Sequence, residues 1–194
     1  RYPSLPLGVA EYIGLDFHSP YGCSKGAADQ YVRDYSRIYG LKTVVFRQSC
    51  IYGPHQFGIE DQGWVAWFTI ASLTNKPITV YGDGHQVRDV LHVDDLAHLY
   101  ESAIENMGKV SGKVYNIGGG PGRASSVRQA LTLLEVLLNK KIPLAFSDWR
   151  PGDQRIYISD IRRIKHDLGW EPKIDFPKGL QSLVDWAKAN EKAI

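Results

Sequence analysis

The chain has 194 residues, of which 43% are hydrophobic and 23% charged, and its formal net charge is +2. This composition can build the core of one large domain, or of a domain and a half, without disulfide or metal support. Lys and Arg are dispersed, and no stretch reaches the roughly 18 apolar residues of a membrane span, so neither a nucleic-acid nor a membrane partner is expected.

Cysteine and histidine usage argues against further classes of site. The two cysteines, Cys23 and Cys50, do not make a disulfide framework, and we expect both to be small buried residues of a cytoplasmic protein in a reducing cytosol. The six histidines show no metal-ligand spacing and no G-x-S-x-G elbow occurs, so neither a metal site nor a Ser-His-Asp triad is expected.

The chain opens in a stretch rich in proline and glycine. Residues 1–18 are predicted to be a loop, because periodicity is broken at Pro3, Pro6, Gly8 and Gly14. The first residue is Arg1 rather than Met, and no signal peptide is recognisable. We expect the rear part of a longer protein.

The first predicted helix runs from Pro20 to Tyr39. Ser19 is a natural N-cap, Pro20 fits the first helical position, where no backbone N–H is needed, and Gly40 fits the position after the last turn. An apolar stripe at helical spacing is typical of a helix that packs by one face, and it consists of Ala27, Ala28, Tyr31, Val32, Tyr35 and Ile38.

Tyr21 and Lys25 stand four residues apart, just inside this helix. Residues i and i+4 share a helical face, so the phenol and the ammonium are expected to project in the same direction. A nearby cation stabilises a phenolate, which favours a base that takes a proton from an alcohol near neutral pH. The same spacing also arises by chance on many helices, where the ring is packed and the amine is solvated. The spacing alone does not decide between a catalytic pair and this structural alternative.

Apolar runs and turn residues predict the remaining elements. Short strands are expected at residues 43–46 (buried on both faces), 78–81, 87–92, 114–117, 142–146 and 156–158. Helices are expected over 64–73, from Asp94 or Asp95 to Gly108, from the Ser126/Gln129 capping box to Leu138, over 160–168, and from about Pro177. Helices alternate with strands at crossover distance, so the fold class is α/β with part of the sheet parallel.

Five motifs follow one another in an order that resembles a known family. They are Tyr21-x-x-x-Lys25, Arg47-Gln48-Ser49-Cys50-Ile51-Tyr52-Gly53-Pro54, the stretch from Val80 through Arg88-Asp89-Val90 to Val93-Asp94-Asp95, Tyr115-Asn116-Ile117-Gly118-Gly119, and Arg150-Pro151-Gly152-Asp153. From about residue 16 on, the chain resembles the extended short-chain dehydrogenase/reductase family of NAD-dependent nucleotide-sugar epimerases and dehydratases. Within that family, residues 15–31 and Asp61-Gln62-Gly63-Trp64 are similar to the epimerases that act on C2 of CDP-paratose.

The resemblance implies the rear part of a Rossmann-type parallel sheet plus a smaller α/β unit that binds the nucleotide sugar. It assigns residues 1–53 and about 87–117 to the first unit, and about 54–86 and 118–194 to the second. The N-terminal NAD-binding half of the family, with its Gly-rich pyrophosphate turn and catalytic Ser or Thr, is absent, so this chain alone is expected to be inactive. Gly118–Gly122 is expected to be a plain turn, because it lacks the G-x-G-x-x-G pattern and Pro121 removes an N–H.

The family likeness also implies roles for residues near the cofactor, NAD. Tyr21 is the expected general base, and Lys25 is its electrostatic partner and bonds the nicotinamide ribose. The loop Gln48-Ser49-Cys50-Ile51 is expected to meet the nicotinamide and the sugar, at the carboxyl end of a buried strand where open α/β sheets bind ligands. Sugar dehydratases often carry two asparagines at the positions of Cys50 and Ile51, so contacts from the backbone are expected there.

Two arginines resemble those that clamp the substrate diphosphate in the family. A planar guanidinium donates two bonds at once, which suits Arg88 and Arg150 to phosphate. The alternative is surface ion pairing, with Asp89 beside Arg88 and Asp153 near Arg150. Asp153 is expected to accept from the ribose hydroxyls, whereas Tyr81 either stacks on the base or belongs to the core. The expected substrate contacts are therefore Tyr81, Arg88, Ser125, Arg150 and Asp153.

The resemblance thus implies an NAD-dependent epimerase whose partner is a nucleotide-diphosphate sugar, with C2 epimerisation of CDP-paratose through a keto sugar as its most specific form. A 4,6-dehydratase or a C4 epimerase of the same family is the enzymatic alternative, and a non-catalytic NAD-fold sensor or scaffold is the alternative of another class. A homodimer or higher homo-oligomer is expected. Tyr31, Tyr35 and Tyr39 would then form its outer face, unless they pack within the fold.

Overall fold

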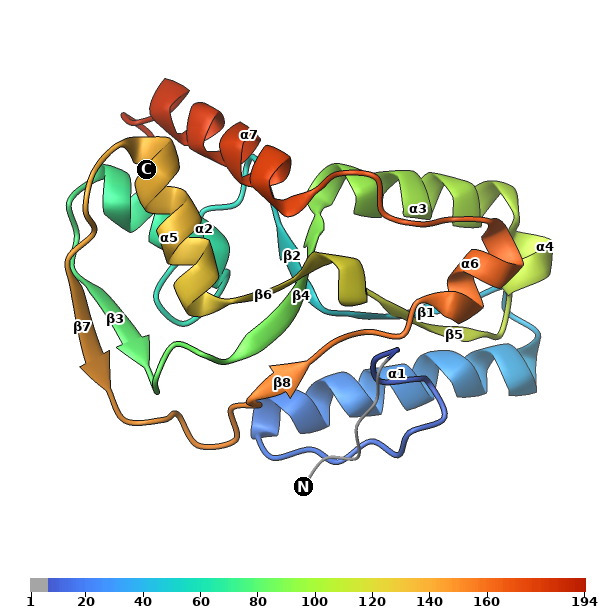
Figure 1. The fold of residues 1–194 in the computed structure, drawn as a ribbon. Coiled ribbons are helices and arrows are strands. Elements are labelled where there is room, and N and C mark those ends of the chain that lie inside the picture. Colours follow the sequence, from blue (N-terminus) through green and yellow to red (C-terminus); the bar gives the residue numbers. More distant parts are fainter. Residues whose placement is uncertain (1–6) are drawn as a thin grey trace.

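A computed structural model describes residues 7–194, and Pro3 and Pro6 of the predicted N-terminal loop lie outside them (Figure 1). Helices are α1 (Pro20–Tyr39), α2 (Trp64–Leu73), α3 (Val93–Glu105), α4 (Met107–Val110), α5 (Val127–Leu138), α6 (Arg162–Leu168) and α7 (Phe176–Ala189). Strands are β1 (Val45–Gln48), β2 (Cys50–Tyr52), β3 (Ile78–Tyr81), β4 (Val87–His92), β5 (Val114–Ile117), β6 (Ala124–Ser126), β7 (Leu144–Ser147) and β8 (Ile156–Tyr157). Within residues 7–194, no helix is both long and apolar enough to cross a membrane.

The predicted α/β class with parallel pairing is confirmed. β1 pairs with β5, β2 with β4, β3 with β7 and β8 with β4, all in parallel, whereas β6 joins β4 in antiparallel. β1 and β2 form one extended segment interrupted at Ser49, so its first half pairs with β5 and its second half with β4. β4 therefore lies in the middle of the molecule, where it touches three other strands (Figure 1).

Two hydrophobic clusters form the core, and the central strands serve both. Successive side chains of a strand point to opposite faces, so Val90 of β4 enters one cluster and Leu91 the other. The first cluster lies among α2, α5, α7 and β3, and the second among α3, α6 and β5. Figure 1 shows these as two lobes, with α7 running along the top of the first.

Most predicted elements are confirmed, and the structure shows where the others differ. The strand near residue 45 is only half-buried, rather than buried on both faces. α3 is capped by His92, whose ring accepts from the Asp94 N–H, rather than by Asp94 or Asp95. The Asp95 carboxylate instead accepts the backbone N–H groups of residues 173 and 174, at 3.1 and 2.9 Å. The helix ends at Glu105 with Asn106 as its C-cap, so Gly108 lies within α4 and does not close α3.

The apolar stripe of α1 is exposed, contrary to the pattern of a packed helix. In α1 only Gly26 and Asp29 are buried, and Tyr31 and Ile38 are each 68% exposed. The prediction that Cys23 is buried is wrong for the same reason, whereas Cys50 is partly buried. The helix touches β1 along one narrow side, and nothing among residues 7–194 covers the rest. Tyr31, Tyr35 and Tyr39 therefore do not pack within the described fold.

α7 meets the end of β4 at a close contact between a glycine and two rings. A Cβ on Gly179 would lie 2.1 Å from the Tyr52 hydroxyl and 2.9 Å from the His92 ring, so only glycine fits there. His92 is 2% exposed, and its Nε2 lies 3.1 Å from Ser182 Oγ on α7. Burial lowers the pKa of His92 below its usual value of 6.5, against the opposing effect of Asp94 and Asp95.

Acidification is expected to destabilise this fold through His92. The unfolded state takes up a proton as the pH falls through about 6.5, while the buried ring resists it, so stability is retained above that pH and is lost below it. His92→Asn keeps an acceptor for the helix N-terminus but removes the titrating ring. Urea unfolding at about pH 8 and about pH 5.5 should show a smaller pH dependence in the variant. Equal pH dependence in both proteins would contradict the assignment.

Candidate functional site

A cavity of about 360 Å³ opens between the two-stranded sheet β3–β7 and the centre of the molecule. Four of the five predicted substrate residues, Tyr81, Arg88, Arg150 and Asp153, line it. They come from the end of β3, the start of β4 and the loop between β7 and β8. The rest of the wall was not foreseen as a site, and it includes Glu60, Asp61, Trp64 and Gln86.

Each arginine of the cavity has an acidic partner, but not the one expected from chain proximity. Arg88 Nη2 lies 2.7 Å from Asp153 Oδ1, with side chains 16% and 29% exposed. Arg150 Nη2 lies 3.0 Å from Asp61 Oδ1. Asp89 turns away from Arg88, because neighbouring residues of a strand face opposite sides. Two guanidinium groups therefore face one cavity, and each is paired with a carboxylate.

Tyr81 presents its ring to the cavity instead of packing in the core. Its side chain is half-buried, and the Arg150 guanidinium lies 3.9 Å from the ring centroid. The Tyr81 hydroxyl donates to Glu60 Oε1 at 3.0 Å. A planar cation therefore lies over the Tyr81 ring, which shows that the ring can hold a planar group.

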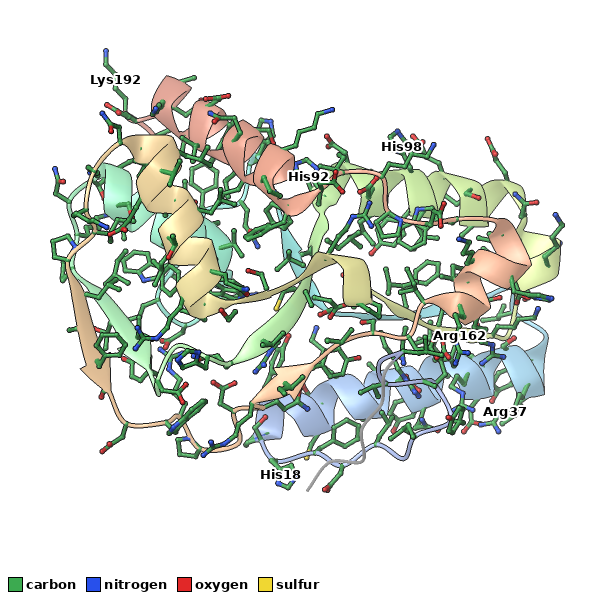
Figure 2. All side chains as sticks on the ribbon, in the orientation of Figure 1. His18, Arg37, His92, His98, Arg162 and Lys192 are labelled. Carbon is green, nitrogen blue, oxygen red and sulfur yellow. The ribbon has the colours of Figure 1, made fainter. Side chains whose placement is uncertain are left out.

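Tyr21 and Lys25 share a face of α1, as predicted. Ser19 Oγ accepts from the Gly22 N–H at 3.0 Å, which fixes the start of the helix, and Lys25 Nζ lies 5.5 Å from the centroid of the Tyr21 ring. The Tyr21 ring is 69% exposed, so it is not the packed ring of the alternative interpretation. The pair stands open at the N-terminal end of the helix, where Figure 2 labels His18.

One contact places the start of this helix beside the cavity, and another fixes the helix to β1. A Cβ on Gly152 would lie 3.5 Å from His18 Cβ, so the loop that carries Arg150 and Asp153 touches the segment just before α1. Farther along, Arg47 of β1 holds Asp29 of α1, with Nε to Oδ2 at 2.6 Å and Nη2 to Oδ1 at 3.2 Å. The loop between β7 and β8, which lines the cavity, therefore lies beside the N-terminal end of α1 (Figure 1).

The predicted cofactor loop is mostly strand, and its four side chains diverge. Gln48 ends β1 and donates to the Tyr100 hydroxyl on α3. The Ser49 hydroxyl donates to the Asp89 carboxylate at 2.6 Å. Cys50 packs on the first core cluster and Ile51 on the second. Burial raises the pKa of the Cys50 thiol, and Trp64 Nε1 lies 3.4 Å from its sulfur.

Asp89 is a fully buried carboxylate that sequence reasoning missed. It binds Ser49 on one side and accepts the Gly120 N–H at 3.0 Å on the other. A Cβ on Gly118 would lie 2.0 Å from Asp89 Oδ2. The glycine-rich segment is thus pressed against β4 and ends in a 3₁₀ turn, Pro121–Arg123, so the predicted turn is confirmed and no open phosphate cradle exists there.

Ser125 is the one predicted substrate residue outside the cavity wall. It is Arg88's partner in the β4–β6 pairing, it is 6% exposed, and its hydroxyl donates to the Ser126 carbonyl. Asp61 and Trp64 of the wall carried one signal in the sequence, because Asp61-Gln62-Gly63-Trp64 was part of the resemblance, whereas Glu60 carried none. No group of three or more His, Cys, Asp or Glu side chains within residues 7–194 is arranged to hold a metal ion.

Comparison with known proteins adds three kinds of finding. The model of the NAD dependent epimerase/dehydratase family matches residues 8–118. CDP-paratose 2-epimerase of Salmonella typhi is 46% identical over 189 residues, which cover 95% of this chain and 56% of that protein. dTDP-glucose 4,6-dehydratase of Neisseria meningitidis is 38% identical, covering 89% of this chain and 50% of that protein. The chain spans about half the length of these curated relatives.

Among solved structures, UDP-glucuronic acid 4-epimerase of Bacillus cereus, in complex with UDP-glucuronic acid and NAD, matches with a TM-score of 0.85. The sequences are 27% identical, and the match covers 94% of this chain and 56% of that chain. The matched region therefore includes both α1 and the part of the chain that lines the cavity.

Proposed function

Because the chain belongs to the NAD dependent epimerase/dehydratase family, we propose that it supplies the substrate-binding and proton-transfer parts of an NAD-dependent nucleotide-sugar epimerase. The observation that carries this proposal is the cavity in which two arginines and an accessible tyrosine ring adjoin the Tyr21–Lys25 helix. Guanidinium groups suit a diphosphate, and an aromatic face suits a nucleobase. The sugar then reaches out of the cavity toward Tyr21.

In this proposal Tyr21 removes the proton of a sugar hydroxyl, and Lys25 stabilises the phenolate through its charge. NAD, when bound, supplies the hydride acceptor and returns the hydride to the keto sugar. Tyr21 gives the proton back to the oxygen, so its own protonation state is restored at the end of the cycle. Arg88 and Arg150 hold the diphosphate while the sugar presents its other face, which inverts one carbon.

The residues present fit the nicotinamide end of NAD and not its pyrophosphate. Tyr21 and Lys25 are exposed on one face of the helix, and no other side chain among residues 7–194 ion-pairs with Lys25. The only glycine-rich turn of the described chain is packed against Asp89, so the pyrophosphate needs residues from elsewhere.

The finer substrate proposal is a CDP-linked dideoxyhexose epimerised at C2. Its support is the 46% identity to CDP-paratose 2-epimerase over nearly the whole chain. A 4,6-dehydratase is the second candidate, favoured by the 38% identity to a dTDP-glucose 4,6-dehydratase. The two differ in products, because the dehydratase loses water and leaves a keto sugar, so mass analysis of the product separates them.

We also propose the division into a cofactor unit (1–53 and about 87–117) and a substrate unit (about 54–86 and 118–194), together with pairing of two copies through α1. The first core cluster and the cavity support a separate substrate unit. Ile164 and Trp170 pack with β5, so the segment around α6, which belongs to the proposed substrate unit, contacts the cofactor unit. The exposed Tyr31, Tyr35 and Tyr39 support pairing.

Arg88→Gln tests the cavity directly. We expect the Kd for a CDP-sugar to rise by roughly 10- to 100-fold, because the variant loses a charge-assisted, largely buried contact to the diphosphate. Isothermal titration of the full-length protein measures it. Arg128→Gln is the matched control, since Arg128 lies outside this cavity and donates to the Asp83 carbonyl. If both variants lose the same affinity for the CDP-sugar, or if neither loses any, Arg88 does not bind the diphosphate.

A further inference from the structure

The face of Tyr81 is surrounded by hydrogen-bond acceptors. The planar group that occupies it, the Arg150 guanidinium, lies 3.9 Å from the ring centroid and directs Nη2 at Asp61 Oδ1 (3.0 Å) and at the Glu60 carbonyl oxygen (3.4 Å). The Glu60 carboxylate stands at the far end of the ring, where it accepts from the Tyr81 hydroxyl. A flat group on Tyr81 therefore finds oxygen lone pairs along its edge.

Such a wall distinguishes the pyrimidine bases by chemistry. Cytosine carries an exocyclic N4 amine that donates two hydrogen bonds, whereas uracil and thymine carry the O4 acceptor at the same position. A carboxylate such as Asp61 is acceptor-only when ionised. An amine edge therefore reproduces the bonds of the guanidinium that it displaces, and an O4 edge brings two sets of lone pairs together. Rejection of this kind is stronger than discrimination by shape.

We propose that Asp61, with the backbone carbonyl of Glu60, selects a cytosine nucleotide over uracil and thymine nucleotides at this site. The inference rests on the proposed function, in which the base lies on Tyr81. Displacement of Arg150 by the base frees Asp61 from its ion pair and frees the guanidinium for the diphosphate. Asp61 is then a specificity-determining residue that accepts from the cytosine amine. Its side chain is 82% exposed before the base arrives, so it loses little packing when substituted.

Titration of CDP, UDP and dTDP into the full-length protein tests the inference. We expect CDP to bind about tenfold more tightly than UDP or dTDP, or better, which is the range of one good base contact. Asp61→Asn places an N–H2 group opposite O4, so UDP should bind more tightly and the CDP/UDP ratio should fall to within about threefold. Asp61→Ala removes the acceptor without adding a donor, so CDP should weaken while UDP stays unchanged.

Asp148→Asn is the matched control, because it removes the same charge from an exposed position outside the cavity wall. Its CDP/UDP ratio should equal that of the wild type. Wild-type protein that binds UDP or dTDP as tightly as CDP overturns the inference and leaves the proposed function standing, and so does an unchanged ratio in Asp61→Asn. Failure of the wild type to bind any nucleoside diphosphate overturns the proposed function and the inference together.

Discussion

Replacing Tyr21 with Phe is expected to lower kcat on the order of 10²–10⁴-fold, with nucleotide-sugar affinity largely kept. The variant keeps the ring and the helix but loses the hydroxyl that takes the proton. The ring is 69% exposed, so the loss of one oxygen costs the fold little. Turnover of a CDP-linked dideoxyhexose by the full-length enzyme gives kcat, and titration of the same protein with the substrate gives the affinity.

Tyr39→Phe is the matched control, since it removes a hydroxyl from the other end of the same helix, where the ring is 68% exposed. Its kcat should equal that of the wild type. Near-wild-type turnover by Tyr21→Phe would end the assignment of Tyr21 as the base. A large rise in Kd without a fall in kcat would instead make Tyr21 a binding residue.

Arg47→Met is expected to destabilise the protein by about 3 kcal/mol, which is the scale of breaking one side of a buried ion pair. The Asp29 side chain is 7% exposed, so its carboxylate would remain buried without the guanidinium that now makes two contacts to it. Arg33 lies 3.8 Å away and compensates only in part. The midpoint of urea unfolding of the full-length protein measures the loss.

The comparison variant for this prediction is Arg37→Met on the same helix. Arg37 pairs with Asp34 on the solvent side, where the two side chains are 61% and 52% exposed, so its loss should cost less than about 1 kcal/mol. If both variants unfold at the same urea concentration, the Asp29–Arg47 pair does not fix α1 to β1. A fall in kcat that accompanies the loss of stability would link the position of α1 to the position of Tyr21.

Two kinds of sequence signal proved reliable in this chain. The start and end of α1 were predicted from Ser19, Pro20 and Gly40, and the structure has Pro20–Tyr39 with both caps as expected. The Ser126/Gln129 capping box is present at α5 in both of its hydrogen bonds. The order of five motifs indicated the family, which the family model over residues 8–118 confirms.

Other predictions depended on partners that the local pattern does not contain. The acid that pairs with Arg88 is Asp153, 65 residues later, and the adjacent Asp89 is instead fully buried against Ser49 and Gly120. Asp95 is one of the two predicted caps of α3, but its carboxylate accepts two N–H groups nearly 80 residues away. Tyr31 and Ile38 have the spacing of a packed face, and they are exposed because nothing in residues 7–194 covers them.

The sequence by itself determined most helices, most strands, the α/β class and the family, together with the shared face of Tyr21 and Lys25. Those features follow from caps, periodicity and turn residues, which act over a few positions and need no distant partner. Only the tertiary structure decided which carboxylate pairs with which arginine. It also decided that the Arg150 guanidinium lies on the Tyr81 ring, with hydrogen-bond acceptors along the edge of the guanidinium. Those contacts are made where crossover connections bring separate loops together, and a local sequence pattern does not encode that meeting point.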